Sequence, residues 1–290
     1  MAVLRFLDDD ELLPAGSRRR EVGAGSARSL LLTVLGEFVH PRGGPVWTAT
    51  LVGALGTLGV EEKSARQAIS RSGADGVLVS ERSGRRVYWN ITAPGTRLLA
   101  EGTRRIYTFL TDSSAWDGRW LVLSVAVPEA QRQLRHRLRT QLTWLGMGSP
   151  VPGIWVVPDT GRETSVAAVI EDLGLVELAF AWTGTVAPIG SPETMIQDAW
   201  SLDDVEQRYD DFLSTFGELE VTTPLEAFVA QVRLVQAWRR FPFLDPALPR
   251  ELLDHDWPGP QAAKLFHRRH DEWHAAAQGY WSDLQSRTSS

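Results

Sequence analysis

The chain has 290 residues, of which 43% are hydrophobic and 23% charged, with a formal net charge of −6 and no cysteine. This composition is typical of a globular protein with room for two or three domains, and no apolar run is long enough to span a bilayer. The absence of cysteine excludes disulfides, thiolate nucleophiles and cysteine-ligated metals, and it fits the reducing cytoplasm.

Residues 1–24 are predicted to form an N-terminal tail. The tail contains an acidic block, Asp8 to Glu11, and lacks the basic flank and apolar core of a secretory signal. Three consecutive arginines, Arg18 to Arg20, follow the block. They form either an arm that lies near DNA phosphates or a solubilising tail.

Residues 25–110 have the pattern of a winged helix-turn-helix DNA-binding domain. Helical apolar spacing predicts helices over 28–40, 48–58 and 61–72, with Thr48 as the N-cap of the second and Gly59-Val60 as the turn before the third. Two extended runs then follow, and Ser83-Gly84 joins them as a hairpin. The hairpin is the predicted wing.

The third helix of this domain has two different faces. Ala65, Ala68 and Ile69 fall on one side at about 100° per residue. The opposite side carries long donors and hydroxyls, the side chains that read base edges and contact phosphates: Lys63, Arg66, Gln67, Ser70 and Arg71. Three arginines near the hairpin tip are predicted to contact the DNA backbone or minor groove: Arg82, Arg85 and Arg86. The alternative interpretation is an amphipathic helix with a solvated polar face beside an arginine-rich loop.

The charge of the chain is divided unevenly. Residues 18–105 hold 14 basic and 7 acidic side chains, a net of +7, which leaves −13 for the rest of a chain that totals −6. A basic module on an acidic body attracts DNA locally, while the body disfavours non-specific coating of the duplex.

Residues 111–184 follow the order β-α-β-β-α-β, which predicts a ferredoxin-like central domain with two helices on one antiparallel sheet. Its first strand, over 120–127, is almost continuously apolar and therefore predicted to be central and buried. A metal-dependent nuclease needs carboxylates at strand ends, and this strand contains none. We find no phosphate loop and no Ser/His/Asp set, so we predict no catalytic residues and no enzyme activity.

Residues 185–290 are predicted to form a mostly helical domain for dimerisation and effector binding. The fold class as a whole is therefore multidomain α+β. His267, His270 and His274 recur on the last helix at a spacing that can present imidazoles to zinc, with His255 as a further candidate ligand. The alternative is polar helix surface, and we predict no metal and no cofactor.

The chain resembles the PaaX-like repressors, bacterial regulators of phenylacetic acid catabolism, over roughly Ala27 to Tyr280. The resemblance depends on motifs in all three regions: Ala27-Arg-Ser-Leu-Leu, Gly59-Val-Glu-Glu, Ala65-Arg-Gln-Ala-Ile-Ser-Arg71, Gly84-Arg-Arg-Val-Tyr88, Trp116-Asp-Gly-Arg-Trp120, Arg137-Leu-Arg139, Gly153-Ile-Trp-Val-Val-Pro158, Arg240-Phe-Pro-Phe-Leu-Asp-Pro-Ala-Leu-Pro249 and Trp257-Pro-Gly259. Two positions depart from the family pattern, since Glu61 replaces a serine at the start of the recognition helix and Asp254 replaces a proline.

The resemblance implies a dimeric repressor that an aryl-CoA thioester releases, phenylacetyl-CoA in the named members. It also implies that the central domain is similar to a CRISPR-associated adaptation nuclease that has lost its catalytic aspartate. The departures leave the target site and the effector open.

An aryl-CoA needs an apolar slot for its acyl group and cations for its phosphates. One segment of the acidic C-terminal region offers both: Arg233, Trp238, Arg239, Arg240, Phe241, Phe243 and Trp257. The alternative is that the aromatic residues are core and that Arg239 and Arg240 pair with Asp245, Asp254 or Asp256.

The sequence therefore predicts a transcriptional repressor that binds a near-palindromic double-stranded operator as a homodimer. We expect it in the bacterial cytoplasm, associated with the nucleoid when bound to DNA, with a small-molecule effector and no membrane partner. The alternative function is a metal-dependent nuclease, or another enzyme, with an accessory DNA-binding head.

Overall fold

The N-terminal and C-terminal parts of the chain share one packed unit. The computed structural model describes residues 26–111, 115–187 and 189–289, so the predicted tail with Arg18 to Arg20 lies outside the described residues. Unit 1 comprises the chain up to Thr111 together with 211–240 and 261–290, and unit 2 comprises 112–210 and 241–260. In the described ranges no helix combines the length and the apolar composition needed to cross a membrane.

The N-terminal part of unit 1 contains three helical segments and a hairpin, in the predicted order, and a fourth helix follows them. In chain order the elements are α1 (Ala27–Val34), a π-helical turn (Leu35–Val39), β1 (Val46–Trp47), α2 (Thr48–Thr57), α3 (Glu62–Ala74), β2 (Leu78–Ser83), β3 (Arg86–Ile91) and α4 (Ala93–Thr108). β1 and β2 flank β3 in an antiparallel sheet, a third strand that the sequence did not predict.

Glycines allow the two tight connections in this part of the chain. Gly59, between α2 and α3, has a φ of +86°, and Gly84, in the hairpin, has a φ of +63°. Both values lie in the left-handed region, where a side chain is strained and glycine is not. The predicted turn and hairpin positions are thus confirmed.

The prediction that Thr48 caps α2 is wrong. Trp47 occupies the N-cap position, and Thr48 is the first residue of the helix. The Thr48 hydroxyl donates to the carbonyl of Val87 at 3.0 Å and accepts from Trp89 Nε1 at 2.9 Å. Its side chain therefore ties α2 to β3 instead of satisfying the start of its own helix.

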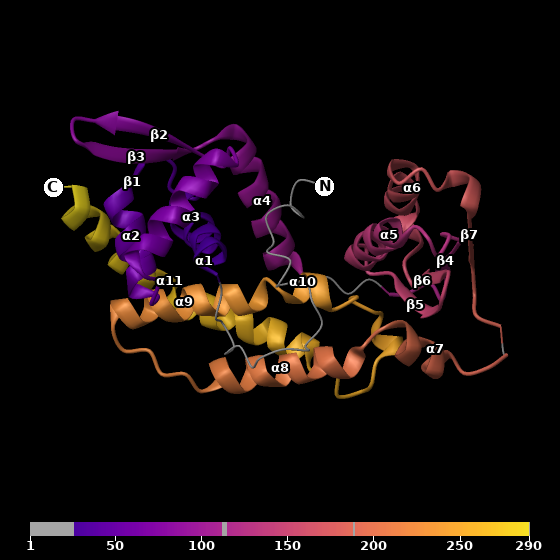
Figure 1. The fold of residues 1–290 in the computed structure, drawn as a ribbon. Coiled ribbons are helices and arrows are strands. Elements are labelled where there is room, and N and C mark those ends of the chain that lie inside the picture. Colours follow the sequence, from indigo (N-terminus) through magenta and orange to yellow (C-terminus); the bar gives the residue numbers. More distant parts are fainter. Residues whose placement is uncertain (1–25, 112–114, 188, 290) are drawn as a thin grey trace. The chain divides into compact units, whose positions relative to one another are not determined.

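Helices from the C-terminal part of the chain complete the core of unit 1. They are the end of α8 (Leu202–Gly217), α9 (Pro224–Trp238) and α11 (Gly259–Ser289), and Figure 1 shows α11 running beside α9. Phe38 packs against Phe228 and Trp281, with ring centroids 4.9 and 5.6 Å apart, and all three side chains are fully buried. Burying three large aromatic side chains is a substantial hydrophobic contribution, so the N-terminal helices depend on α9 and α11.

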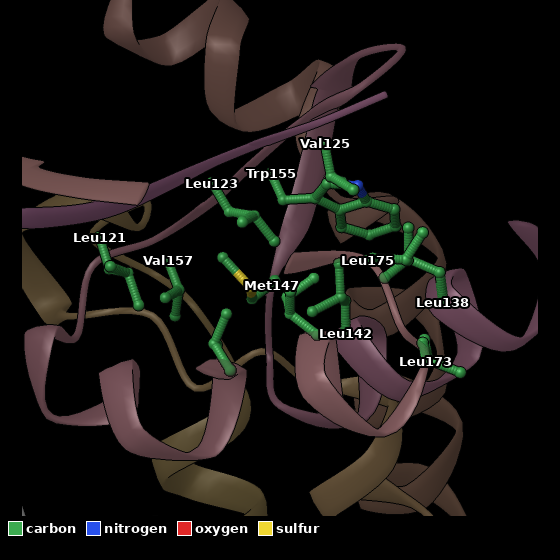
Figure 2. Close-up of a cluster of buried hydrophobic side chains, with 12 residues drawn as sticks. Leu121, Leu123, Val125, Leu138, Leu142, Met147, Trp155, Val157, Leu173 and Leu175 are labelled. Atoms are coloured by element: carbon green, nitrogen blue, oxygen red, sulfur yellow. The ribbon is translucent and has the colours of Figure 1, made fainter. Parts of the chain in front are cut away.

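Unit 2 is built on a four-stranded antiparallel sheet in the order β5-β6-β4-β7. The β-α-β-β-α-β order is confirmed: β4 (Trp120–Val125), α5 (Arg132–Trp144), β5 (Gly148–Val151), β6 (Ile154–Val157), α6 (Glu163–Asp172) and β7 (Ala179–Gly184). Leu121, Leu123 and Val125 of β4 face α5 and α6 in one buried cluster (Figure 2). The central position predicted for the first strand is correct, since β4 pairs with both β6 and β7.

The other face of this sheet is covered by a helix that the sequence did not predict. α7 (Pro192–Ala199) contributes Ile196, which packs with Trp120 and Val156. A side-chain carbon added at Gly148 of β5 would lie 2.4 Å from the ring of Trp200, so only glycine fits this contact. The short helix α10 (Phe241–Leu244) and residues up to Pro260 also belong to unit 2. The predicted C-terminal region, 185–290, is therefore divided between the two units.

Candidate nucleic-acid interface

Helix α3 has one buried and one exposed side, in the arrangement that the sequence predicted. Ala65, Ala68 and Ile69 are buried against unit 1, and α3 contacts α1 and α2. The opposite side is exposed at every predicted position: Lys63, Arg66, Gln67, Ser70 and Arg71. Arg28 of α1 forms a 2.7 Å ion pair with Asp75, just after α3, and so helps to hold the helix in place.

Arg66 has a partner that the prediction did not include. Its Nε donates to Glu62 Oε1 at 2.8 Å, an ion pair between residues four apart on the same helix. Both side chains are exposed, and such pairs contribute only about 0.3–0.5 kcal/mol. A nucleic-acid contact can therefore replace the ion pair at little cost.

The three arginines of the hairpin occupy two different environments. Arg82, on β2, and Arg85, in the turn, are exposed, as predicted. Arg86 is half-buried: its guanidinium lies 4.5 Å from the ring centre of Trp47 and donates to the backbone carbonyl of Thr288 at the end of α11. The structure does not test the predicted contact of Arg86 with DNA, and it shows that this side chain connects the hairpin to α11.

A buried polar network joins four helical segments of unit 1. Glu37, in the π-helical turn, accepts hydrogen bonds from the Tyr107 hydroxyl at 2.8 Å and from Gln231 Nε2 at 2.8 Å. His270 Nε2 lies 2.9 Å from Glu37 Oε2 and 2.7 Å from the Tyr107 hydroxyl. The network joins the turn after α1 to α4, α9 and α11.

Burial by itself would raise the pKa of Glu37, but hydrogen bonds from His270, Gln231 and Tyr107 outweigh it and hold the pKa below its usual value. Glu37 is thus a buried carboxylate that stays charged because it is surrounded by donors. Burial, followed by the nearby charge of Glu37, raises the pKa of Tyr107, so this phenol remains a donor. In the sequence, Glu37 is a single acid among apolar residues at 34–39. Its partners lie 70 to 233 residues away along the chain, so the local sequence could not predict the network.

The three histidines of α11 do not converge on one point. His270 belongs to the network with Glu37, His267 is half-buried and His274 is exposed. Burial lowers the pKa of His267. Within the described ranges, no group of three or more His, Cys, Asp or Glu side chains is arranged to hold a metal ion.

The predicted effector segment is divided between the two units. In unit 1, Trp238 is fully buried, stacks on Phe266 and donates from Nε1 to the carbonyl of Ile106 at 3.0 Å. Arg239 donates to the backbone and side-chain oxygens of Ser29 at 3.3 Å each, whereas Arg233 is exposed and Arg240 is half-buried.

The remaining effector residues are in unit 2. Phe241 and Trp257 are buried around Tyr209, which lies parallel to Phe241 with ring centroids 4.1 Å apart, and Phe243 packs on Trp144. The Tyr209 hydroxyl donates to Asp245 at 2.5 Å, and burial raises the pKa of Asp245. Trp238, Phe241 and Trp257 are therefore buried among other aromatic side chains, and their role in effector binding stays a prediction.

Comparisons with known families match nearly the whole described chain, one region at a time. The family described as "PaaX-like protein" matches residues 26–95, "PaaX protein central Cas2-like domain" matches 113–196, and "PaaX-like protein C-terminal domain" matches 200–283.

Two individual proteins are also similar. The "Transcriptional repressor PaaX" of Escherichia coli (strain K12) is 28% identical over 251 residues, which covers 83% of this chain and 78% of the relative. The solved structure of "Uncharacterized protein Rv0674 from Mycobacterium tuberculosis" has a TM-score of 0.60 and 24% sequence identity, and the match covers 90% of this chain and 99% of the other. This second likeness concerns the fold alone.

The buried network generates a prediction about stability. Glu37→Gln removes a charged acceptor from buried donors, so we expect the free energy of unfolding at pH 7 to fall by about 1.5–3 kcal/mol. Because the pKa of Glu37 is lowered in the folded state, its contribution is present above the ordinary glutamate pKa, about 4.3, and is lost as the pH falls through the lowered value. Denaturant titrations from pH 7 to well below pH 4 measure this difference.

The matched control is Glu101→Gln, an exposed glutamate on α4. We expect this control to leave the free energy of unfolding nearly unchanged. Equal stability of Glu37→Gln and the wild type at pH 7 would contradict the role assigned to the network.

Proposed function

The chain belongs to the PaaX-like family, and on that basis we propose that it is a DNA-binding transcriptional repressor. We further propose that α2 and α3 with the β2–β3 hairpin form a winged helix-turn-helix, and that unit 2 contains a ferredoxin-like domain. The transcriptional repressor of Escherichia coli among its relatives supports this role.

One observation carries the proposal: the exposed side of α3 presents five adjacent polar side chains on a helix whose other side is packed. Arg66 and Arg71 have the fork that pairs bidentately with guanine, and the Gln67 amide matches adenine. Lys63, nearer the start of the helix, suits a phosphate. Arg82 and Arg85 on the wing are exposed and basic, which suits backbone contacts next to the groove that α3 enters.

We propose that the protein binds a near-palindromic operator as a homodimer. One recognition helix reads only a few base pairs, which is too little to single out a site in a genome. Two helices related by a two-fold axis read two half-sites, spaced by about one helical turn or a multiple of it.

We also propose an aryl-CoA type effector, phenylacetyl-CoA or another acyl-CoA, by analogy with the family. To relieve repression, the effector must bind the DNA-incompetent dimer more tightly than the competent one. Among the residues considered for it, the arginines Arg233, Arg239 and Arg240 stay candidates for contacts to its phosphates. The aromatic residues Trp238, Phe241 and Trp257 are buried, so a contact with the acyl group would require a local rearrangement.

The first prediction concerns α3. Arg66→Ala and Arg71→Ala should each weaken binding to the selected operator by about 1–3 kcal/mol and relax specificity at one base position per half-site. Fluorescence anisotropy with the operator and with single-base variants measures both effects. Arg162→Ala is the control, because Arg162 is an exposed arginine in a comparable 2.8 Å ion pair, with Asp159. Wild-type affinity in both α3 variants would disprove this assignment.

The second prediction separates the wing arginines. Neutralising Arg82 and Arg85 together should weaken binding to all DNA sequences alike. The slope of the logarithm of the binding constant against the logarithm of the salt concentration should become shallower by about 2, one unit for each lost phosphate contact. Arg86→Ala should instead lower stability and leave the slope unchanged, because Arg86 contacts Trp47 and Thr288. An unchanged slope in the Arg82/Arg85 variant would place the wing away from DNA.

The third prediction concerns the effector. Phenylacetyl-CoA should bind the protein in calorimetry and release operator DNA, and coenzyme A, which has the phosphates but lacks the acyl group, should bind more weakly. Arg239→Ala/Arg240→Ala should weaken this binding, whereas Arg268→Ala, at an exposed position of α11, should not. Full affinity in the double variant would remove these two residues from the site. Failure of every acyl-CoA to bind would contradict the effector proposal and leave the DNA-binding proposal standing.

A further inference from the structure

Strand β7 leaves one edge of the sheet in unit 2 open. In the described part of the chain β7 pairs with β4 on one side and has no strand on the other. Its sequence, Ala-Phe-Ala-Trp-Thr-Gly, contains no charge and no proline. Charged residues and prolines usually protect an exposed edge strand, because its open row of N–H and C=O groups can otherwise pair with another strand. β7 lacks this protection.

Two large aromatic side chains on this strand are exposed. Phe180 is 72% exposed and Trp182 is 51% exposed. They pair with Ser124 and Val122 of β4 and lie on the sheet face opposite α5 and α6. Leaving two neighbouring aromatic side chains in water is costly, and exposed apolar patches of this kind mark interaction surfaces.

The backbone geometry determines which groups of β7 are available. The N–H of Ala126 donates to the carbonyl of Leu178 at 3.1 Å, so the backbone of Leu178 points toward β4. Because this orientation alternates along an antiparallel pair, Phe180 and Trp182 also point their backbone groups toward β4. The N–H and C=O groups of Ala179, Ala181 and Thr183 therefore point outward.

This pattern fits a second copy of the same strand running in the opposite direction. With Ala181 opposite Ala181 of the second copy, Ala179 lies opposite Thr183 and all outward groups find partners. The same register places Phe180 opposite Trp182 in a non-hydrogen-bonded pair, where side chains approach most closely. Aromatic cross-strand pairs contribute about 0.2–1 kcal/mol each.

The charges at the two ends of β7 favour the same arrangement. Arg119 is exposed and donates to Thr183 Oγ1 at 2.8 Å, near the end of the strand. Glu177 is exposed and lies two residues before the start of the strand. An antiparallel self-pair therefore brings Arg119 of each copy toward Glu177 of the other, whereas a parallel pair would place like charges together.

We propose that β7 is the dimerisation edge of this protein, where two copies join their sheets through antiparallel β7–β7 pairing about a two-fold axis at Ala181. The choice of a second copy as the occupant rests in part on the proposed repressor function, which requires a two-fold axis. The geometry of the edge supplies the register independently of DNA.

A crosslinking experiment tests the register directly. The chain has no cysteine, so one introduced cysteine reports a single contact. Ala181→Cys faces itself across the axis and should form an intermolecular disulfide under mild oxidation. Ala179→Cys should not, because the two copies of residue 179 are offset by four positions, about 13 Å, beyond the roughly 7 Å limit for a disulfide.

Sedimentation velocity at micromolar concentration tests the interface without any modification. The wild type should sediment as a dimer. Phe180→Lys/Trp182→Lys places like charges opposite each other and should raise the dimer dissociation constant at least about 100-fold. Val151→Lys is the matched control, an exposed valine on the opposite edge strand, β5, and should leave the dimer intact.

The readouts distinguish failure of this proposal from failure of the repressor proposal. A lysine double variant that is monomeric but still binds a half-site supports both proposals, and a dimer that binds no DNA sequence selectively contradicts only the second. A dimer that survives the double substitution, or no crosslink at residue 181, overturns the β7 proposal. A monomeric wild type also overturns it.

Discussion

The packing of Phe38 between Phe228 and Trp281 is the contact on which the rest of unit 1 depends. It joins the turn after α1 to α9 and α11, across about 190 and 240 residues of sequence. Glu37 precedes Phe38 in the chain, and its hydrogen-bond network connects the same turn to α9 and α11 and also to α4. The apolar contact contributes hydrophobic stabilisation, and the hydrogen-bonded carboxylate favours one arrangement of the helices over others.

This arrangement matters for function because it gives α3 a rigid support. The buried side of α3 packs on helices that are themselves held by α9 and α11, so its polar side is presented in one orientation. The hairpin is attached to the same support through Arg86, which contacts the end of α11. A ligand or a partner that shifted α9 or α11 would therefore move α3 and the hairpin together, which would give the proposed effector a physical route to the proposed DNA binding.

Local patterns in the sequence predicted what depends on local geometry. The two sides of α3, the glycine turns and the buried strand β4 follow from helical or strand periodicity, and the structure has them. Contacts between distant segments were not predictable: nothing near Arg86 points to Thr288, and nothing near Glu37 points to His270. Trp238 and Phe241 were ambiguous, because an aromatic residue beside arginines fits either a ligand slot or a core. The chain also passes between the units at 210–211, inside α8, where no change in composition marks a boundary. The crossings at 240–241 and 260–261 flank a proline-rich run, but proline content alone does not show that this run packs with unit 2.

Selection of DNA from a random pool, run in parallel with the wild type and with Gln67→Ala, tests the central claim most directly. The wild type should enrich an inverted repeat, because two copies of α3 read two half-sites. The variant should enrich the same repeat with the preference lost at one position, an adenine, in each half-site. No enriched sequence with the wild type, or an identical motif with the variant, would contradict the claim that the exposed side of α3 reads DNA.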